Sequence, residues 1–224
     1  MSVILQPTHP VEVETRKQVL VSQSGTGARR AVRKSRAFRF YTLEFHGRKQ
    51  SEYSALEPVW AANYPKSTIE WVNSVLDASG QFYFDSPLKW SPTLNNLFDY
   101  AFSLKRRDAQ ALVAQESNVL PFGPSYGYEV NPDKETSVSD SVSYARAAEA
   151  VSSERRLISL VFRARSLAET LLMEQFWDYY YPCSKIAFTE PVLGVDGEFW
   201  IDSNFKWRVL ANHLTEYSFA VREV

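Results

Sequence analysis

Two stretches of the chain share one pattern of hydrophobic and polar residues, 117 positions apart. The segment WAANYP at residues 60–65 is matched by WDYYYP at residues 177–182. The same offset aligns residues 39–105 with residues 156–222 without an insertion or deletion. A shared register of this length indicates an internal repeat rather than chance. Upstream of residue 39 the match fades, so we expect the N-terminal lead of each copy to be the variable part.

Within each copy, short segments of alternating or aromatic character predict strands, and one segment with helical spacing predicts a helix. The predicted order is strand, helix, strand, strand, strand. Turns are expected at residues 77–80 and 194–197, where glycine follows polar residues. The expected strands cover residues 38–45, 67–72, 82–84 and 97–104 in the first copy and 157–162, 185–188, 199–201 and 214–221 in the second.

The two helices differ in their start signals. In the second copy, Ser166 and Glu169 form the pattern of a capping box, and Pro182 is expected to stop the helix. In the first copy, Lys49 stands at the cap position and Pro58 lies inside the pattern. Because an interior proline costs about 3 kcal/mol, we expect this helix to be kinked or to begin later, with Pro58 in its first turn.

These elements predict an α+β fold that is mainly β. We expect two tandem domains, at residues 1–112 and 113–224, each a β-sandwich or barrel-like sheet with one packed helix. Residues 22–36 are expected to form a Gly/Ser turn followed by basic residues, with a hairpin loop at residues 25–30. Residues 107–153 would hold the domain junction and the lead hairpin of the second copy, since one structureless loop of that length is unusual.

Composition adds few constraints on function. The chain has 224 residues, a net charge of −1 and one cysteine, Cys183. A lone thiol is more often a small core or strand residue than a nucleophile. No apolar run is long enough to cross a bilayer, and the first residues lack the features of a signal peptide. We therefore expect a protein that stays in the cytoplasm or enters an assembly built there.

The sequence offers no convincing catalytic, cofactor or metal site. The glycines at 25 and 27 lack the remaining residues of a phosphate-binding motif, and a hairpin loop is the better interpretation. His9, His46 and His213 show no metal-ligand spacing. The carboxylate pairs Asp85 with Asp202 and Glu57 with Glu174 are explained by the repeat, which puts each partner in a different copy. We expect no catalytic residue, no cofactor and no enzyme activity.

The one local charge asymmetry is a basic cluster in and after the first hairpin, formed by Arg29, Arg30, Arg33, Lys34, Arg36 and Arg39. It could meet an acidic neighbouring subunit or nucleic-acid phosphates, or be a solvated hairpin; we favour the hairpin or the subunit contact. Two tyrosines in the junction join it as candidate contacts. The candidate subunit-interface residues are Arg29, Arg30, Arg33, Lys34, Arg36, Tyr126 and Tyr128.

The order of elements resembles that of the lambda M-like minor tail, distal tail and tail-tube proteins of bacteriophages. The resemblance rests on the hairpin at residues 25–30, on a Leu-Glu-x-Phe-like helix motif, on the aromatic strands and on the closing strands. The helix motif reads LEPVW at residues 56–60 and MEQFW at residues 173–177. Duplication within one chain departs from the family, which usually carries one such domain.

The resemblance implies a structural role in the virion, with assembly in the host cytoplasm. Such proteins form rings that join the tail tube above to the tip or baseplate hub below, around a lumen that holds the tape-measure protein or DNA. A duplicated chain could form a pseudo-six-fold ring from three subunits, and six subunits are the alternative. A different class of function, a tandem carbohydrate-binding module, is prompted by Trp90, Trp207, Trp200 and Tyr83.

Overall fold

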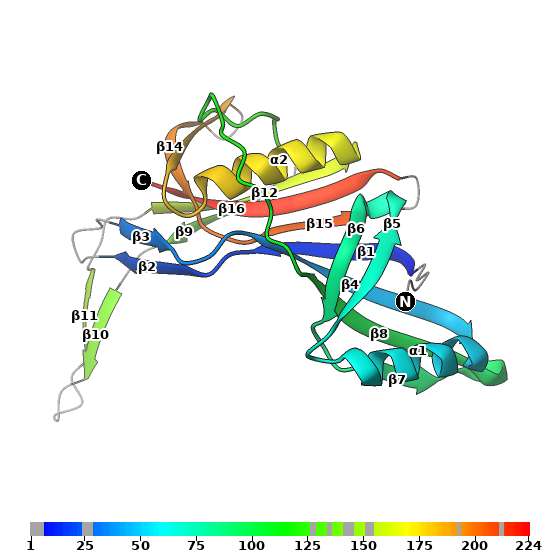
Figure 1. Ribbon diagram of the computed structural model, residues 1–224. Helices are drawn as coiled ribbons and strands as arrows, with labels where there is room; N and C mark the ends of the chain where they lie inside the picture. Colours follow the sequence, from blue (N-terminus) through cyan, green and yellow to red (C-terminus); the bar gives the residue numbers. More distant parts are fainter. Residues whose placement is uncertain are drawn as a thin grey trace.

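The computed structural model describes residues 7–23, 29–125, 129–133, 136–140, 146–150, 155–191, 194–210 and 213–224. In these residues the chain is mainly β, with one large antiparallel sheet and two α-helices (Figure 1). The α+β, mainly β class expected from the sequence is confirmed.

The first copy contains a long strand that leads into the first helix, followed by a hairpin and the closing strands. Its N-terminal part supplies one further strand and a separate two-stranded hairpin. The elements are β1 (Thr8–Arg16), β2 (Val19–Gln23), β3 (Arg29–Arg33), β4 (Phe38–Lys49), α1 (Gln50–Asn63), β5 (Thr68–Asn73), the 3-10 turn η1 (Ser74–Leu76), β6 (Ala78–Phe84), β7 (Lys89–Pro92), η2 (Leu94–Asn96) and β8 (Leu97–Arg106).

The second copy repeats this order. Its expected N-terminal hairpin is formed by β10 and β11, as β2 and β3 form the first one. The elements are β9 (Glu129–Asp133), β10 (Thr136–Asp140), β11 (Arg146–Ala150), β12 (Arg155–Arg165), α2 (Leu167–Tyr180), β13 (Lys185–Glu190), β14 (Val195–Ile201), β15 (Phe205–Val209) and β16 (Thr215–Glu223).

The structural repeat extends further towards the N-terminus than the sequence match. Strands β2 and β3 have the same bounds as β10 and β11 once 117 is added. Strand β1 likewise covers the positions of β9 and pairs with β4 as β9 pairs with β12. The leads therefore differ in sequence but share one arrangement, because backbone pairing tolerates changes of side chain.

The two copies are joined edge to edge. Each copy builds the same core of strands, β1–β4–β8–β7 in the first and β9–β12–β16–β15 in the second. Strand β1 then pairs with β15, which fuses both cores into one antiparallel sheet of twelve strands. The hairpins β5–β6 and β13–β14 continue from the C-terminal halves of β8 and β16.

The shared sheet has one buried face and one open face. Residues directly opposite each other in an antiparallel pair point to the same side. One such row crosses the whole junction and is buried: Leu104, Tyr41, Val13, Trp207, Tyr217 and Phe162. The adjacent row on the other side is polar: Ser103, Thr42, Glu12, Arg208 and Glu216.

Matching aromatic stacks form the core of each copy. Phe45 stacks on Tyr100 with ring centroids 4.5 Å apart, and Phe162 stacks on Tyr217 at the same distance. The helix of each copy packs on the same buried side of its closing strand. Large apolar side chains at equivalent positions therefore hold both units together, as the aligned sequences predict.

The two helices begin at equivalent residues, although their caps differ. Ser166 and Glu169 form the expected capping box of α2, which ends at Tyr180 before Pro182. Helix α1 begins at Gln50 after Lys49, whose side chain makes no cap bond, and Pro58 lies inside it. The expectation of a later start at Pro58 is therefore wrong: packing on β4 and β8 sets the helix start despite the poor local signals.

The turns before β6 and β14 lie earlier than expected. Residues 78–80 and 195–197 belong to strands. In the first copy the chain turns through η1, where the Asn73 side chain accepts hydrogen bonds from the backbone N–H groups of Val75 and Leu76. Asp77 then adopts a left-handed conformation with φ of 49°. The asparagine cap, rather than the glycine, sets this turn.

Four strands of the shared sheet were not predicted individually. Strands β1, β7, β9 and β15 cover only four to nine residues each. Their local patterns are weak, and pairing with distant strands determines them. The missed strands include both members of the pair that joins the two copies.

Candidate functional site

The site that the fold singles out is the seam, the contact between β1 of the first copy and β15 of the second. Val13 lies opposite Trp207 and Glu12 lies opposite Arg208 in this antiparallel pair. Segments almost two hundred residues apart in sequence are thereby hydrogen-bonded side by side (Figure 1). The seam shows how one copy of this unit recognises another.

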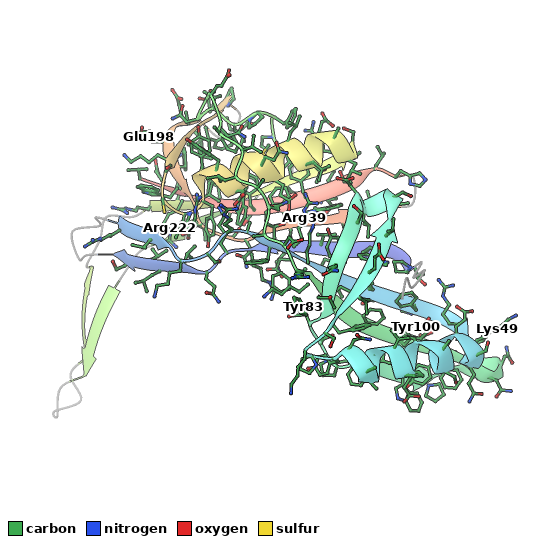
Figure 2. The ribbon with its side chains drawn as sticks, viewed as in Figure 1. Arg39, Lys49, Tyr83, Tyr100, Glu198 and Arg222 are labelled. Carbon is green, nitrogen blue, oxygen red and sulfur yellow. The ribbon has the colours of Figure 1, made fainter. Side chains whose placement is uncertain are left out.

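A buried ion pair lies beneath the seam. Arg39 on β4 donates from Nε to both carboxylate oxygens of Glu174 on α2, at 3.0 Å each, and also from Nη2. The Thr15 hydroxyl donates to the same carboxylate. Burial opposes the guanidinium charge, but the attraction of Glu174 outweighs it and raises the pKa of Arg39. Figure 2 shows Arg39 at the junction of the two copies.

Two further cations of the first copy bind the C-terminal end of α2. Lys17 donates to the carbonyl oxygens of Asp178 and Tyr181, the latter at 3.1 Å, and forms an ion pair with the Asp178 carboxylate. Arg33 donates to the carbonyl oxygen of Tyr179 at 2.9 Å. These carbonyls carry the negative partial charge of a helix end. Burial lowers the pKa of Lys17 to about 8 despite its acidic partner.

The equivalent positions of the first copy are open to solvent. Trp207 of β15 is 1% exposed, whereas its counterpart Trp90 of β7 is 53% exposed. Glu174 is fully buried, whereas its counterpart Glu57 on α1 is exposed. The two copies thus present the same surface, covered in one case and uncovered in the other.

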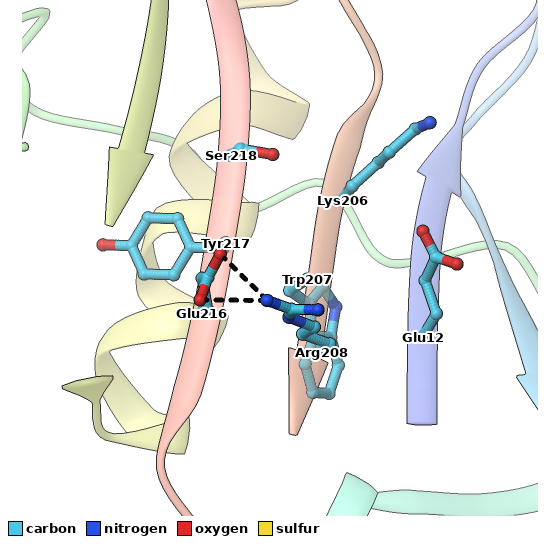
Figure 3. A pocket seen from close by; sticks show the side chains of 7 residues that line it. All are labelled: Glu12, Lys206, Trp207, Arg208, Glu216, Tyr217 and Ser218. Carbon is cyan, nitrogen blue, oxygen red and sulfur yellow. Dashed lines mark hydrogen bonds and ion pairs between the residues drawn. The ribbon is translucent and has the colours of Figure 1, made fainter. Parts of the chain in front are cut away.

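The open face of the sheet carries mixed charges above the seam. Glu12, Lys206, Arg208, Glu216 and Ser218 surround a shallow hollow there (Figure 3). Arg208 and Glu216 form an ion pair at 3.4 Å. Further along this face, the His46 ring nitrogens lie 3.3 Å from Asp99 and 3.4 Å from Glu44, and these acceptors raise the pKa of His46. This face therefore offers polar and charged contacts.

The structure places the predicted interface residues in different environments. Arg33 lies on β3 beside the seam and contacts the end of α2 in the second copy of its own chain. Arg30, Lys34 and Arg36 are exposed, and Arg29 is described by its backbone alone. Tyr126 and Tyr128 lie outside the described residues. Contacts with another subunit stay a prediction for all of these residues.

Sequence reasoning named Glu174 and Arg39 separately but did not predict that they form a buried ion pair beneath the seam. Glu174 stands among apolar residues on α2, where a charge is rarely buried without a partner. The apolar surroundings of Glu174 were a signal that this carboxylate is buried with a partner. The partner, Arg39, could not be identified from the sequence because it lies 135 positions away. The expected core or strand position of Cys183 is wrong: this thiol is exposed in the turn after α2, 3.6 Å from the carbonyl oxygen of Ala31.

Asp85 and Asp202, which are equivalent in the repeat, make equivalent backbone hydrogen bonds. Their N–H groups donate to the carbonyl oxygens of Ser103 and Ala220, both at 2.8 Å. Asp202 also pairs with Arg222 at 2.8 Å. Among the described residues, no three histidine, cysteine, aspartate or glutamate side chains are grouped to hold a metal ion. No helix in that part of the chain is long and apolar enough to cross a membrane.

Comparison with known proteins leaves the resemblance to phage tail proteins as an expectation. No family model matches the chain, and no curated protein matches it in sequence.

Proposed function

We propose that the chain is a structural virion protein that forms a ring in the distal tail of a bacteriophage. In this role it joins the tail tube to the tip or baseplate hub. The ring surrounds a lumen for the tape-measure protein or DNA. Three duplicated chains would give pseudo-six-fold symmetry, and six chains are the alternative.

The observation that carries the proposal is the one-sided sheet that runs through both copies. Both helices cover the same face of this sheet, and the opposite face is polar along the whole junction. The wall of a channel can be built by adding equivalent units edge to edge. In such a wall the helices lie on the outer face, and the polar face of the sheet lies towards the channel.

The ring is tested by the mass and shape of the assembled protein. Native mass spectrometry should give three chains of 25.7 kDa, and electron microscopy should show an annulus with a central channel. Labelled antibodies should bind the distal end of tails that carry the protein. A monomer at every concentration, or labelling elsewhere on the particle, would contradict the proposal.

Carbohydrate binding is the alternative, and the exposure of Trp90 favours it. Sugar platforms require accessible rings. Trp207 is buried, whereas Trp90 is more than half exposed beside Tyr53, with ring centroids 5.5 Å apart. A glycan array with the isolated chain separates the two functions, because clear binding that is lost in Trp90→Ala would support the module.

A further inference from the structure

We propose that chains pair head to tail, with strand β9 of one chain adding to strand β7 of the next in a copy of the internal seam. The partner at the exposed α1–β7 surface is thus the second copy of another identical chain. This inference deepens the proposed ring and shares its premise that the chain associates with itself.

The strands at the two ends of the shared sheet correspond, through the repeat, to the two strands that form the seam. Strand β7 is the counterpart of β15, and β9 is the counterpart of β1. In the described part of the chain, β7 pairs with β8 alone and β9 with β12 alone, so each leaves one edge unpaired. The internal β1·β15 pair shows that these two kinds of edge fit each other. An unpaired strand edge is a template for pairing with another chain.

The repeat offset fixes the register of the proposed pair. Subtracting 117 from Trp207 gives Trp90, and adding 117 to Val13 gives Val130. The internal pair Val13 with Trp207 thus becomes Val130 with Trp90 between chains. By the same operation Glu12 with Arg208 becomes Glu129 with Ser91.

The buried ion pair of the seam also has its counterparts. Arg39 corresponds to Arg156 on β12, and Glu174 corresponds to Glu57 on α1. Arg156 is bound to Glu223 at 2.7 Å on the surface, with its side chain 37% exposed. Glu57 is exposed and accepts a hydrogen bond from the Tyr53 hydroxyl at 3.2 Å. Glu57 is therefore accessible for the contact that Glu174 makes inside the chain, and Arg156 would exchange Glu223 for Glu57 in that contact.

An apolar surface accompanies these charges. Trp90 is 53% exposed, and Trp60 and Leu88 are half-buried. Their counterparts Trp177 and Phe205 are fully buried by the seam. Burial of such aromatic side chains is what gives an interface most of its affinity.

The contact between chains lacks several features of the internal one. Thr15, which donates to Glu174, is replaced by Pro132, and Arg208 is replaced by Ser91. Asp178, the partner of Lys17, is replaced by Ala61, and Arg33 is replaced by Ala150. We therefore expect the contact between chains to be weaker than the seam, and to depend mainly on strand pairing, Trp90 and the Glu57–Arg156 pair. Such a contact is heterologous, so it builds a ring when the rotation closes and a filament when it does not.

Cysteine cross-linking tests the register directly. In a Cys183→Ser background, one chain carries Ser91→Cys and a second carries Glu129→Cys. Residues directly opposite in antiparallel strands have Cα atoms about 4.5–5.5 Å apart, within reach of a disulfide. The matched control is the internal pair, Glu12→Cys with Arg208→Cys in one chain, which should form its disulfide within the monomer and give no covalent oligomer. Mild oxidation of the mixed single variants should give a covalent dimer.

The outcomes separate the strand pairing from the ring. A chain with both Ser91→Cys and Glu129→Cys should oxidise to one closed covalent oligomer. An open ladder would support the pairing and contradict the ring. Dimers of the Ser91→Cys chain alone, or no covalent product while native mass spectrometry still shows an oligomer, would overturn the pairing and leave the ring. A monomer throughout would overturn both.

A charge swap provides the second test. Glu57→Arg places two cations together in the proposed interface and should weaken association by about a hundredfold. Adding Arg156→Glu to the same chain should restore it. Because Glu57 is exposed, thermal unfolding of the Glu57→Arg monomer should change little. Arg156→Glu also removes the Arg156–Glu223 pair, so the stability of each monomer is measured beside its association. Equal association of the single and double variants would contradict the pairing.

Discussion

The two copies differ in whether their equivalent helix and closing-edge strand are covered. Helix α2 and strand β15 are covered by β1, Lys17, Arg33 and Arg39 of the first copy. Helix α1 and strand β7 carry a matching Trp, Glu and Lys-Trp pattern but are exposed. The difference therefore comes from the neighbour and not from the unit itself. The uncovered surface exposes Trp90, whereas the covered one buries its counterpart Trp207.

The tryptophan pair gives the largest expected difference between the copies. Trp207→Ala removes a fully buried ring and should lower the free energy of unfolding by about 4 kcal/mol. Trp90→Ala removes a ring that is half in water, so its effect on the isolated chain should be well below half of that. Urea titration of both variants measures the contrast. Equal losses would show that Trp90 is as much a core residue as Trp207.

The glutamate pair should behave in the same way. Glu174→Ala leaves Arg39 buried without its partner and should cost about 3 kcal/mol of stability. Glu57→Ala is the matched control and should leave the monomer's stability nearly unchanged, since Glu57 is exposed. Chemical denaturation below the concentration of assembly measures both. A large loss in Glu57→Ala would contradict the assigned role of the seam.

Lys17 should give the seam a dependence on pH. Its folded pKa is about 8, and its unfolded pKa is roughly 10.4. Between these values the unfolded chain binds the proton and the folded chain does not, so stability rises with pH, by at most about 3 kcal/mol. Because tyrosines and other lysines also titrate there, the measurement is the difference between the wild type and Lys17→Met from pH 7 to 10.5. A difference that does not change with pH would refute the buried charge.

The helix caps should give the smallest effect. Ser166→Ala removes the capping box of α2 and should cost about 1 kcal/mol. Lys49→Ser supplies the missing cap of α1 and should gain a similar or smaller amount. Thermal unfolding measures both changes. A stabilising effect of Ser166→Ala would show that the cap does not contribute as the geometry indicates.

The sequence predicted the elements whose signals lie within a few neighbouring residues and recur in both copies. The strands around Phe45, Tyr100, Phe162 and Tyr217, the capping box at Ser166 and both hairpins follow from patterns within short windows. The start of α1 was harder, because Lys49 and Pro58 are poor local signals and packing overrides them.

The seam could not be predicted in the same way. Its strands are short, and its partners lie in different copies. Glu174 and Arg39 are individually ordinary in sequence, and only the folded chain brings them together. Once the β1·β15 contact within the chain is known, however, the repeat predicts the β9·β7 contact between chains. Strand β9 is the counterpart of β1, and β7 is the counterpart of β15.

Amide hydrogen exchange tests this central claim most directly, by comparing Lys89–Ser91 of β7 with Phe205–Val209 of β15. The β15 amides should be protected in the monomer and in the assembly alike. The β7 amides on the free edge should exchange quickly in the monomer and become protected on assembly, together with β9. If β7 still exchanges quickly in the assembled particle while the other interfaces become protected, chains do not pair as a copy of the seam.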